Sequence, residues 1–382
     1  MSEEELLAVC LSKVNGLGRK NIYRLLKEAG SLKGIFEMRK EEIIACIGLR
    51  YAKNLFEVWG GGGNDAVKRC LVKGEQYRLR YEKEGIRCIS CMSEAFPYRL
   101  QQIPDPPFCI YVKGGLPAAQ MPCVAIVGAR ACSTYGRSVA YSFGKELAEA
   151  GVGIISGMAR GIDGIAQEGA VAGGGKTFAV LGGGVDFCYP PEHKGLYEAV
   201  CQTGGVISEY VPGTEPRANF FPERNRIISG MADLVLVIEA RKRSGTYITV
   251  TQALEQGRDV FAVPGRVTDA LSDGCNSLIK DGAGLADSTE TILRALESCG
   301  YSLDSGSKQG NAEPERAAAE GLKGELLALI DLTPIHLEEL YKRLNENKVV
   351  LREEVLVELM HMELEGLIWN RGNYYSKKEL LS

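Results

Sequence analysis

The feature that most constrains the fold is a series of short apolar runs between residues 124 and about 295, most of which lead into glycine and then a helical pattern. The series reads VAIVG, VGIISG, KTFAVLGG, GVISEY, ADLVLVIEA and DVFAVPG. Strands that are apolar throughout are buried on both faces, as in parallel sheets covered by helices. The sequence therefore predicts a Rossmann-like, doubly wound, mostly parallel α/β sheet.

The segment before this sheet has a different pattern. Residues 1–63 carry apolar side chains at helical spacing, which predicts a small helical domain of the SAM or helix-hairpin-helix kind. In VNGLGRK, the turn made by Gly16 and Gly18 has amides that can meet a phosphate, and the same glycines also suit plain helical packing. Gly60 to Gly63 form a predicted joint.

Residues 64–300 are predicted to form the extended Rossmann-like domain. IRCIS and the strand Phe108 to Val112 are expected to add strands to the sheet that begins at Val124. Residues 301–318 lack apolar periodicity and are predicted to be a linker. In residues 319–382, three helical patterns precede an aromatic hairpin, which predicts a winged helix. Its candidate recognition helix, LREEVLVELMHMELEG, is acidic and favours protein contact over duplex binding.

Composition excludes some classes of protein. The net charge of −4 gives no strong field toward nucleic acid or membrane, so any nucleic-acid binding must come from a local patch. The N-terminus lacks a signal-peptide pattern and no apolar run reaches roughly 20 residues, so we expect a cytoplasmic protein. The twelve cysteines are scattered and are expected to be reduced. Cys88 and Cys91 form a CxxC without a second pair, so no metal is expected.

The loops that follow the strands carry the candidate chemistry, because ligands of such sheets lie beyond the carboxyl ends of the strands. In GARACSTYG, Arg130 stands where the GxGxxG fingerprint needs its second glycine, so no nicotinamide cofactor is expected. An arginine at a helix start, where N–H groups and the helix dipole favour an anion, predicts phosphate binding. The alternative is a surface ion pair.

Three further loops repeat this chemistry. SGMARGID places Arg160 between glycines, with Asp163 as a possible N-cap. FPERNR adds two arginines next to an amide and aromatic residues, and RKRSGT adds three cations and hydroxyl groups ahead of a helix. Between residues 217 and 243 there are six basic residues against three acidic ones, which predicts a local basic face.

The sequence gives weaker support for an enzyme than for a phosphate-binding protein. His193 is the only histidine of the central domain, and neither GxSxG nor HExxH is present. The GKT of residues 175–177 precedes a strand and is expected to be a turn. Asp163, Asp186 and Glu239 are the best carboxylates for nucleotide hydrolysis, without a paired geometry that the sequence can assign.

The loops as an ordered set resemble the DNA-processing protein A (DprA/Smf) family from about residue 124 to 287. The resemblance implies a non-catalytic, single-stranded DNA-binding protein of natural transformation (competence) and DNA recombination. Such a protein protects incoming strands, loads the RecA recombinase on them and dimerises through its Rossmann-like domain. It implies that phosphates are faced by Arg130, Arg160, Arg224, Asn225, Arg226, Ser244, Gly245, Thr246 and Asn276. The predicted DNA-binding residues also include Gly128, Tyr135, Gly136, Gly157, Phe221 and Arg243.

Two positions depart from the family pattern. Ala129 stands where many members have serine, and Glu223 stands where many have a basic residue or glutamine, which is expected to weaken the local positive potential. Tyr135 and Phe221 are candidates for base stacking, with loop packing as the alternative.

A phosphoribohydrolase-like enzyme on the same fold is the second hypothesis for function. Such enzymes carry a PGGxGTxxE loop. Here RSGTYITVTQALEQG lacks the glycine pair and displaces Glu255 by several residues.

Overall fold

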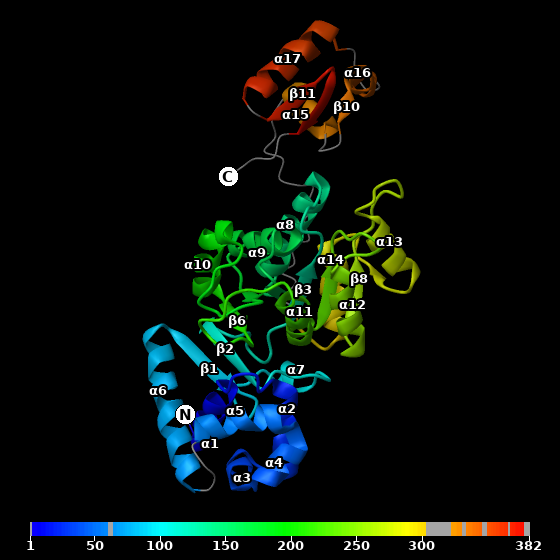
Figure 1. Ribbon diagram of the computed structural model, residues 1–382. Helices are drawn as coiled ribbons and strands as arrows, with labels where there is room; N and C mark the ends of the chain where they lie inside the picture. Colours follow the sequence, from blue (N-terminus) through cyan, green and yellow to red (C-terminus); the bar gives the residue numbers. More distant parts are fainter. Residues whose placement is uncertain are drawn as a thin grey trace. The chain divides into compact units, whose positions relative to one another are not determined.

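The computed structural model describes residues 2–59, 64–302, 322–330, 334–345, 350–365 and 367–377 (Figure 1). The chain divides into two compact units, residues 1–303 and 304–382, which are considered separately. The predicted joint at residues 60–63 and most of the predicted linker at 301–318 lie outside the described residues. The domain boundaries proposed from the sequence stay predictions.

The first unit is built on a sheet that has nine strands in its described part, in the order β1-β2-β6-β5-β4-β3-β7-β8-β9. The strands are β1 (Ile86–Ser90), β2 (Cys109–Gly114), β3 (Cys123–Val127), β4 (Gly153–Ser156), β5 (Thr177–Val180), β6 (Gly205–Ser208), β7 (Leu234–Val237), β8 (Asp259–Ala262) and β9 (Gly284–Leu285). The seven strands from β6 to β9 in this order run parallel, and β2 pairs antiparallel with both β6 and β1. The predicted mostly parallel sheet is confirmed.

Helices cover both faces of this sheet. They are α7 (Tyr98–Gln101), α8 (Thr134–Glu149), α9 (Ile162–Ala172), α10 (Lys194–Thr203), α11 (Phe220–Met231), α12 (Thr246–Glu255), α13 (Asp273–Lys280) and α14 (Thr289–Ser298), with a 3₁₀ turn at Pro191–His193. Alternate residues of β3 serve the two cores: Val124 packs with α8 and α9, and Ala125 with α11 and α12. Every residue of β3 is buried, which explains its unbroken apolar run.

The chain order along the sheet reverses at β3. Strands β4, β5 and β6 follow on one side of β3, whereas β7, β8 and β9 follow on the other. The loops after β3 and β7 therefore part from each other and leave a crevice at the carboxyl edge, where ligands of such sheets bind.

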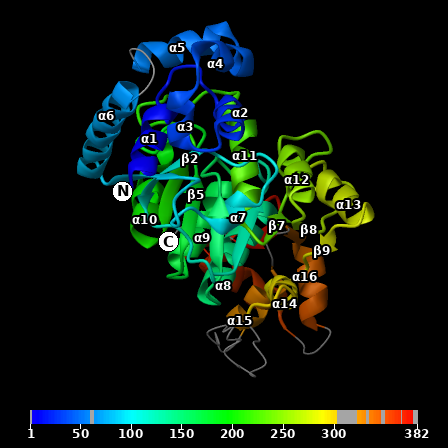
Figure 2. The same ribbon diagram turned by 90° about the horizontal axis from the view of Figure 1, so that it is seen from below.

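The N-terminal segment is helical, with α1 (Glu3–Ser12), α2 (Arg19–Ala29), α3 (Leu32–Glu37), α4 (Lys40–Ile47) and α5 (Leu49–Trp59), followed by the long α6 (Asn64–Lys83). Figures 1 and 2 show α1 to α5 gathered beside the β1 and β2 end of the sheet. Their core includes Phe108 and Cys109, so these helices pack directly on the antiparallel edge. The SAM or helix-hairpin-helix assignment stays a prediction.

The second unit has its own core. It contains α15 (Leu322–Leu329), α16 (Leu337–Asn345), α17 (Arg352–Leu364) and a sheet of β10 (Ile335–His336), β12 (Tyr374–Lys377) and β11 (Ile368–Arg371), in that order. The predicted three helices and aromatic hairpin are present, and the winged-helix assignment stays a prediction. Across the described ranges of both units, no helix combines the length and the apolar character that a bilayer span requires.

Candidate nucleic-acid interface

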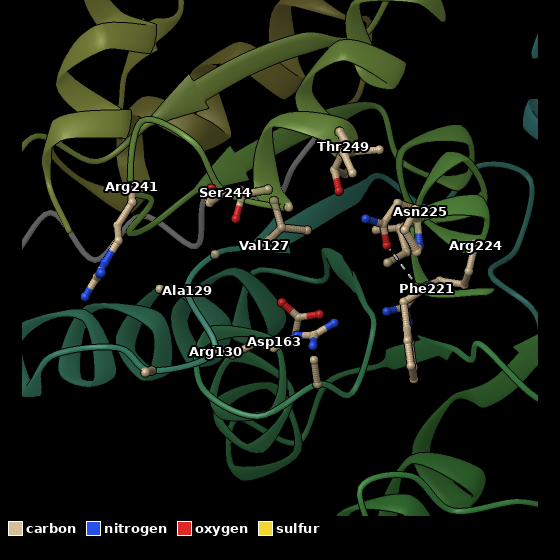
Figure 3. A pocket seen from close by; sticks show the side chains of 18 of the residues that line it. Val127, Ala129, Arg130, Asp163, Phe221, Arg224, Asn225, Arg241, Ser244 and Thr249 are labelled. Atoms are coloured by element: carbon tan, nitrogen blue, oxygen red, sulfur yellow. Dashed lines mark hydrogen bonds between the residues drawn. The ribbon is translucent and has the colours of Figure 1, made fainter. Parts of the chain in front are cut away.

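A pocket of about 810 Å³ lies in the crevice between the loops that follow β3 and β7 (Figure 3). We call it the first pocket. Its charged lining residues are Arg130, Arg224 and Arg241 against the single Asp163, so its lining carries a net positive charge. Apolar contacts come from Phe221 and neighbouring residues, so the pocket combines cations with an aromatic surface.

Arg130 and two aromatic rings form a stack in the first pocket. The Arg130 guanidinium lies 5.4 Å from the centre of the Phe221 ring, within cation–π range. The Tyr189 ring is 5.5 Å from Phe221, with 34° between the planes. Arg130 is exposed and forms no ion pair with any described residue. An exposed cation without an ion pair, beside the half-buried Phe221 ring and the exposed Tyr189 ring, suits a phosphate and a base.

The start of α8 differs from the expectation that it would bind a phosphate. The Glu239 carboxylate, buried at 2% exposure, accepts hydrogen bonds from the Ser133 N–H at 2.9 Å and from the Ser133 hydroxyl at 2.5 Å. The helix dipole therefore already has an anion at its positive end. In this loop the Arg130 side chain is then the group that stays a candidate for phosphate binding.

Gly136 belongs to this internal anion site. A Cβ atom at Gly136 would lie 2.3 Å from Cδ of Glu239, so only glycine lets the carboxylate reach the start of α8. Gly136 is buried and does not line the first pocket. The structure therefore explains this glycine by packing, and its predicted role in DNA binding has no geometric support.

Asp163 joins two of the loops. It lies within α9, not at its N-cap as expected, and its carboxylate accepts a hydrogen bond from the Gly157 N–H at 3.2 Å. Burial raises the pKa of this carboxyl group above its ordinary value, while the nearby charges of Arg224 and Arg130 and the backbone N–H groups act in the opposite direction. Figure 3 shows Arg130 and Asp163 close together in the pocket.

Arg224 anchors α11 to the sheet edge. It is 4% exposed, and its guanidinium donates to the carbonyl oxygens of Gly157, at 2.8 Å, and Val180. The pKa of Arg224 is lowered to about 10, chiefly by burial and also by the charge of Arg130, whereas Asp163 acts in the opposite direction. A Cβ atom at Gly157 would lie 2.4 Å from the guanidinium nitrogens, so this glycine makes room for Arg224.

Arg226 lies outside the first pocket. It is 5% exposed, and its guanidinium contacts both Glu209 oxygens at 2.6 and 2.5 Å and lies 3.5 Å from Asp105. Arg19 of α2 completes this network with two hydrogen bonds to Asp105 and a 3.9 Å approach to Glu223. These partners explain why neither Arg226 nor Glu223 lines the pocket. Arg19 directly follows the turn made by Gly16 and Gly18. Because its side chain is held by these acidic residues, the structure favours packing over phosphate contact for that turn.

Two further predicted residues serve loop structure. The Asn276 amide accepts from the Gly265 N–H at 3.2 Å and donates to the Gly265 carbonyl at 3.0 Å, which uses both ends of the amide. The Tyr135 hydroxyl donates to the Pro264 carbonyl at 3.2 Å, and the ring lies outside the first pocket. Both residues hold the loop after β8, so their DNA contact stays a prediction without geometric support.

The loop after β7 brings several predicted residues into the first pocket. Ser244, Gly245 and Thr246 line it at the start of α12, which has no acidic residue in its first turn. The Ser244 hydroxyl is buried, with no hydrogen-bond partner in the part of the chain that the structure describes. Arg241 lines the pocket as well, whereas Arg243 is exposed outside it.

Some of the remaining residues that were predicted to bind DNA line the first pocket, and others lie outside it. Gly128 and Asn225 line the first pocket, and Asn225 accepts a hydrogen bond from Arg224 at 3.2 Å. Arg160 does not line it and pairs with Glu192. Tyr189 was missed by the sequence analysis, although its loop, LGGGVDFCYPPE, follows β5 at the same sheet edge.

The candidate catalytic groups do not assemble. Of the three carboxylates considered for hydrolysis, only Asp163 lines the first pocket, because Asp186 accepts bonds from the Gly213 N–H and Glu239 caps α8. Glu255 is exposed at the last position of α12. The predicted turn lies at Gly173–Gly174, just before the GKT segment, and Thr177 of that segment is the first residue of β5. Within the described ranges, no three His, Cys, Asp or Glu side chains are grouped as a metal site requires.

Comparison with known proteins gives a consistent result. Residues 87–297 match the family of DNA recombination-mediator protein A. The DNA processing protein DprA of Streptococcus pneumoniae is 44% identical over 223 residues, which cover 57% of this chain and 77% of that protein. The structure of DprA from Streptococcus pneumoniae has a TM-score of 0.63 at 34% identity and covers 77% of this chain and 98% of that one.

A further structure concerns DNA directly. The structure of DNA processing protein A from Helicobacter pylori, described for its single-stranded DNA binding mode, has a TM-score of 0.50 at 29% identity. It covers 56% of this chain and 96% of that one. On the family match and these relatives, the chain belongs to the DNA recombination-mediator protein A (DprA) family.

Proposed function

We propose that this protein binds single-stranded DNA in the first pocket and acts in natural transformation and recombination. The observation that carries the proposal is the stack of Arg130, Phe221 and Tyr189 at a sheet edge whose lining has three arginines against one aspartate. Cations supply sequence-independent affinity for the backbone, and ring faces accept any unpaired base. The single-stranded DNA binding described for the Helicobacter pylori relative supports the same reading.

Finer parts of the proposal concern partners and location. We propose that the protein loads a RecA recombinase on the strand it protects, forms a homodimer through the Rossmann-like unit and is cytoplasmic. Membership of the DprA family supports these proposals. The protein is proposed to act by binding alone, without a cofactor, and the scattered positions of Asp186, Glu239 and Glu255 support this over nucleotide hydrolysis.

The test is a titration of fluorescein-labelled oligo-dT and of a matched duplex, followed by anisotropy at two salt concentrations. We expect a preference for the single strand, with affinity that falls as salt rises. Arg130→Ala and Phe221→Ala should each weaken binding by about tenfold, since each removes a phosphate or stacking contact.

The matched control is Arg80→Ala. Arg80 is an exposed arginine of α6 that lines neither described pocket, so its loss changes the net charge equally. Equal affinity for strand and duplex, or an Arg130→Ala variant that binds like Arg80→Ala, contradicts the proposal. Release of free base from nucleoside monophosphates, abolished by Glu255→Ala, would establish the enzymatic alternative.

A further inference from the structure

A second pocket, of about 330 Å³, adjoins the first and shares Arg130 and Ala131 with it. Its charged lining residues are Arg130, Arg137 and Arg160 against Glu168. Unlike the first pocket, its lining contains no Phe, Tyr or Trp residue among those described. Its lining is dominated by cations, and His193 supplies its one ring among the described residues.

The chain builds this second pocket from two neighbouring loops. The loop after β3 and the start of α9 are joined by a hydrogen bond from the Ile162 N–H to the Ala129 carbonyl at 3.2 Å. Gly161, with φ of 74°, adopts the left-handed conformation that brings the two loops together. His193 closes one side, where its Nδ1–H donates to the Met158 carbonyl at 3.0 Å.

The cations of the second pocket are available to a ligand. Arg137 is exposed in the first turn of α8, and its side chain has no hydrogen bond or ion pair with the rest of the described chain. Arg160 pairs with Glu192, but both side chains are about half exposed, at 58% and 49%. An ion pair so open to water contributes little, so a phosphate can replace Glu192 at small cost.

We propose that the second pocket binds a backbone phosphate of the strand whose bases occupy the first pocket. Arg137 and Arg160 contact that phosphate, and Arg130 lies between the two pockets at the point where the strand passes from one to the other. The proposal rests on the proposed function and adds a direction for the strand: away from Phe221 and toward the start of α8. The carboxylate of Glu168, which also lines the second pocket, opposes phosphate binding there.

The test is a length series of oligo-dT from about 4 to about 16 nucleotides, the range of site sizes for OB folds that bind single strands. Arg137→Ala, Arg137→Lys, Arg160→Ala, Phe221→Ala and the control Arg80→Ala are titrated at several salt concentrations. For the longer oligonucleotides, Arg137→Ala should weaken binding about tenfold and reduce the salt slope by about 0.7, the value for one phosphate contact of a single strand. Arg137→Lys should restore the slope.

The length dependence separates the second pocket from a general charge effect. The loss in Arg137→Ala should shrink toward that of Arg80→Ala for the shortest oligonucleotide, which fills only the first pocket. A loss of equal size at every length, or no loss beyond the control, overturns the proposal. A thermal melt of each variant tests for misfolding. Arg137 is exposed, so its replacement should leave the melting temperature unchanged.

The failure of this proposal is distinct from failure of the proposed function. If Phe221→Ala weakens binding and Arg137→Ala matches Arg80→Ala, the first pocket stands and the second falls. If the wild type shows no preference for the single strand, both fall.

Discussion

Two helices begin at the same edge of the sheet, and they use their positive ends differently. The start of α8 is closed by the buried Glu239 carboxylate, which bonds to Ser133 from 106 residues further along the chain. The start of α12 has no acidic residue in its first turn and opens into the first pocket, where the Ser244 hydroxyl has no partner among the described residues. A helix start is therefore an anion site only where the rest of the fold leaves it open.

One loop produces this difference. Glu239 and Ser244 both follow β7. The Glu239 side chain bonds to Ser133 at the start of α8, whereas Ser244 lies just before α12 and lines the first pocket. The comparison predicts that changes at the α8 start alter stability, whereas changes at the α12 start alter binding.

Removal of the internal anion should have the largest effect. Glu239→Gln keeps the shape of the side chain but exchanges charged hydrogen bonds at the α8 start for neutral ones, so we expect the free energy of unfolding to fall by about 2 kcal/mol. Urea unfolding measures this. Glu255→Gln, at an exposed position of α12, is the control and should be neutral. Equal stability of the two variants would mean that the α8 start does not depend on Glu239.

Loss of the α8 cap should come next. The Ser133 hydroxyl accepts from the Gly136 N–H at 3.0 Å and donates to Glu239, so Ser133→Ala should cost about 1 kcal/mol of unfolding free energy. Affinity for oligo-dT should change less than twofold, since Ser133 does not line the first pocket. An unchanged urea midpoint together with weakened DNA binding would reverse the assignment of the two helix starts.

Ser244→Ala provides the opposite case. Because the Ser244 hydroxyl forms no hydrogen bond within the described chain, its removal should change the free energy of unfolding by less than about 0.5 kcal/mol. Affinity for oligo-dT should fall about threefold, through the loss of one neutral hydrogen bond to the ligand. Anisotropy and urea unfolding on the same preparation measure both. A stable variant with unchanged affinity would show that the α12 start does not contact DNA.

The smallest effect concerns Asp163, the other buried carboxylate at this edge. Burial raises its pKa in the folded protein, so the folded state holds the proton more tightly than the unfolded state. The contribution of Asp163 to stability should therefore decrease as pH rises through the window that begins at the ordinary value of 3.8. Urea unfolding from about pH 4 to pH 7 should show Asp163→Asn gaining stability relative to the wild type as pH rises. A relative loss would contradict the burial account.

The sequence was sufficient for the sheet and for the edge at which the site lies. Continuous apolar runs such as Val124–Val127 permit little besides a strand buried on both faces, and the loops after such strands meet at one edge. Arg130, Phe221 and Arg224, which were predicted to bind DNA, line the first pocket at this edge, and their contact with DNA stays a prediction.

Partners from distant parts of the chain decided the rest of the site. Arg226 follows Arg224 by two residues on the same helix, yet it turns to Glu209 and Asp105 and shares them with Arg19. Position on α11 indicates which strand end a residue approaches, but the side chain's final contact depends on acids that the sequence alone does not place. The same limit applies to Asn276, whose amide is used by Gly265.

The central claim is that unpaired bases lie on the aromatic surface of the first pocket. Photocrosslinking of oligo-dT that carries 5-iodouracil, followed by mass spectrometry of the crosslinked peptides, tests it directly. We predict crosslinks at Tyr189 and Phe221, reduced in Arg130→Ala and unchanged in Arg80→Ala. Crosslinks confined to the N-terminal helices or to residues 322–377 would contradict it.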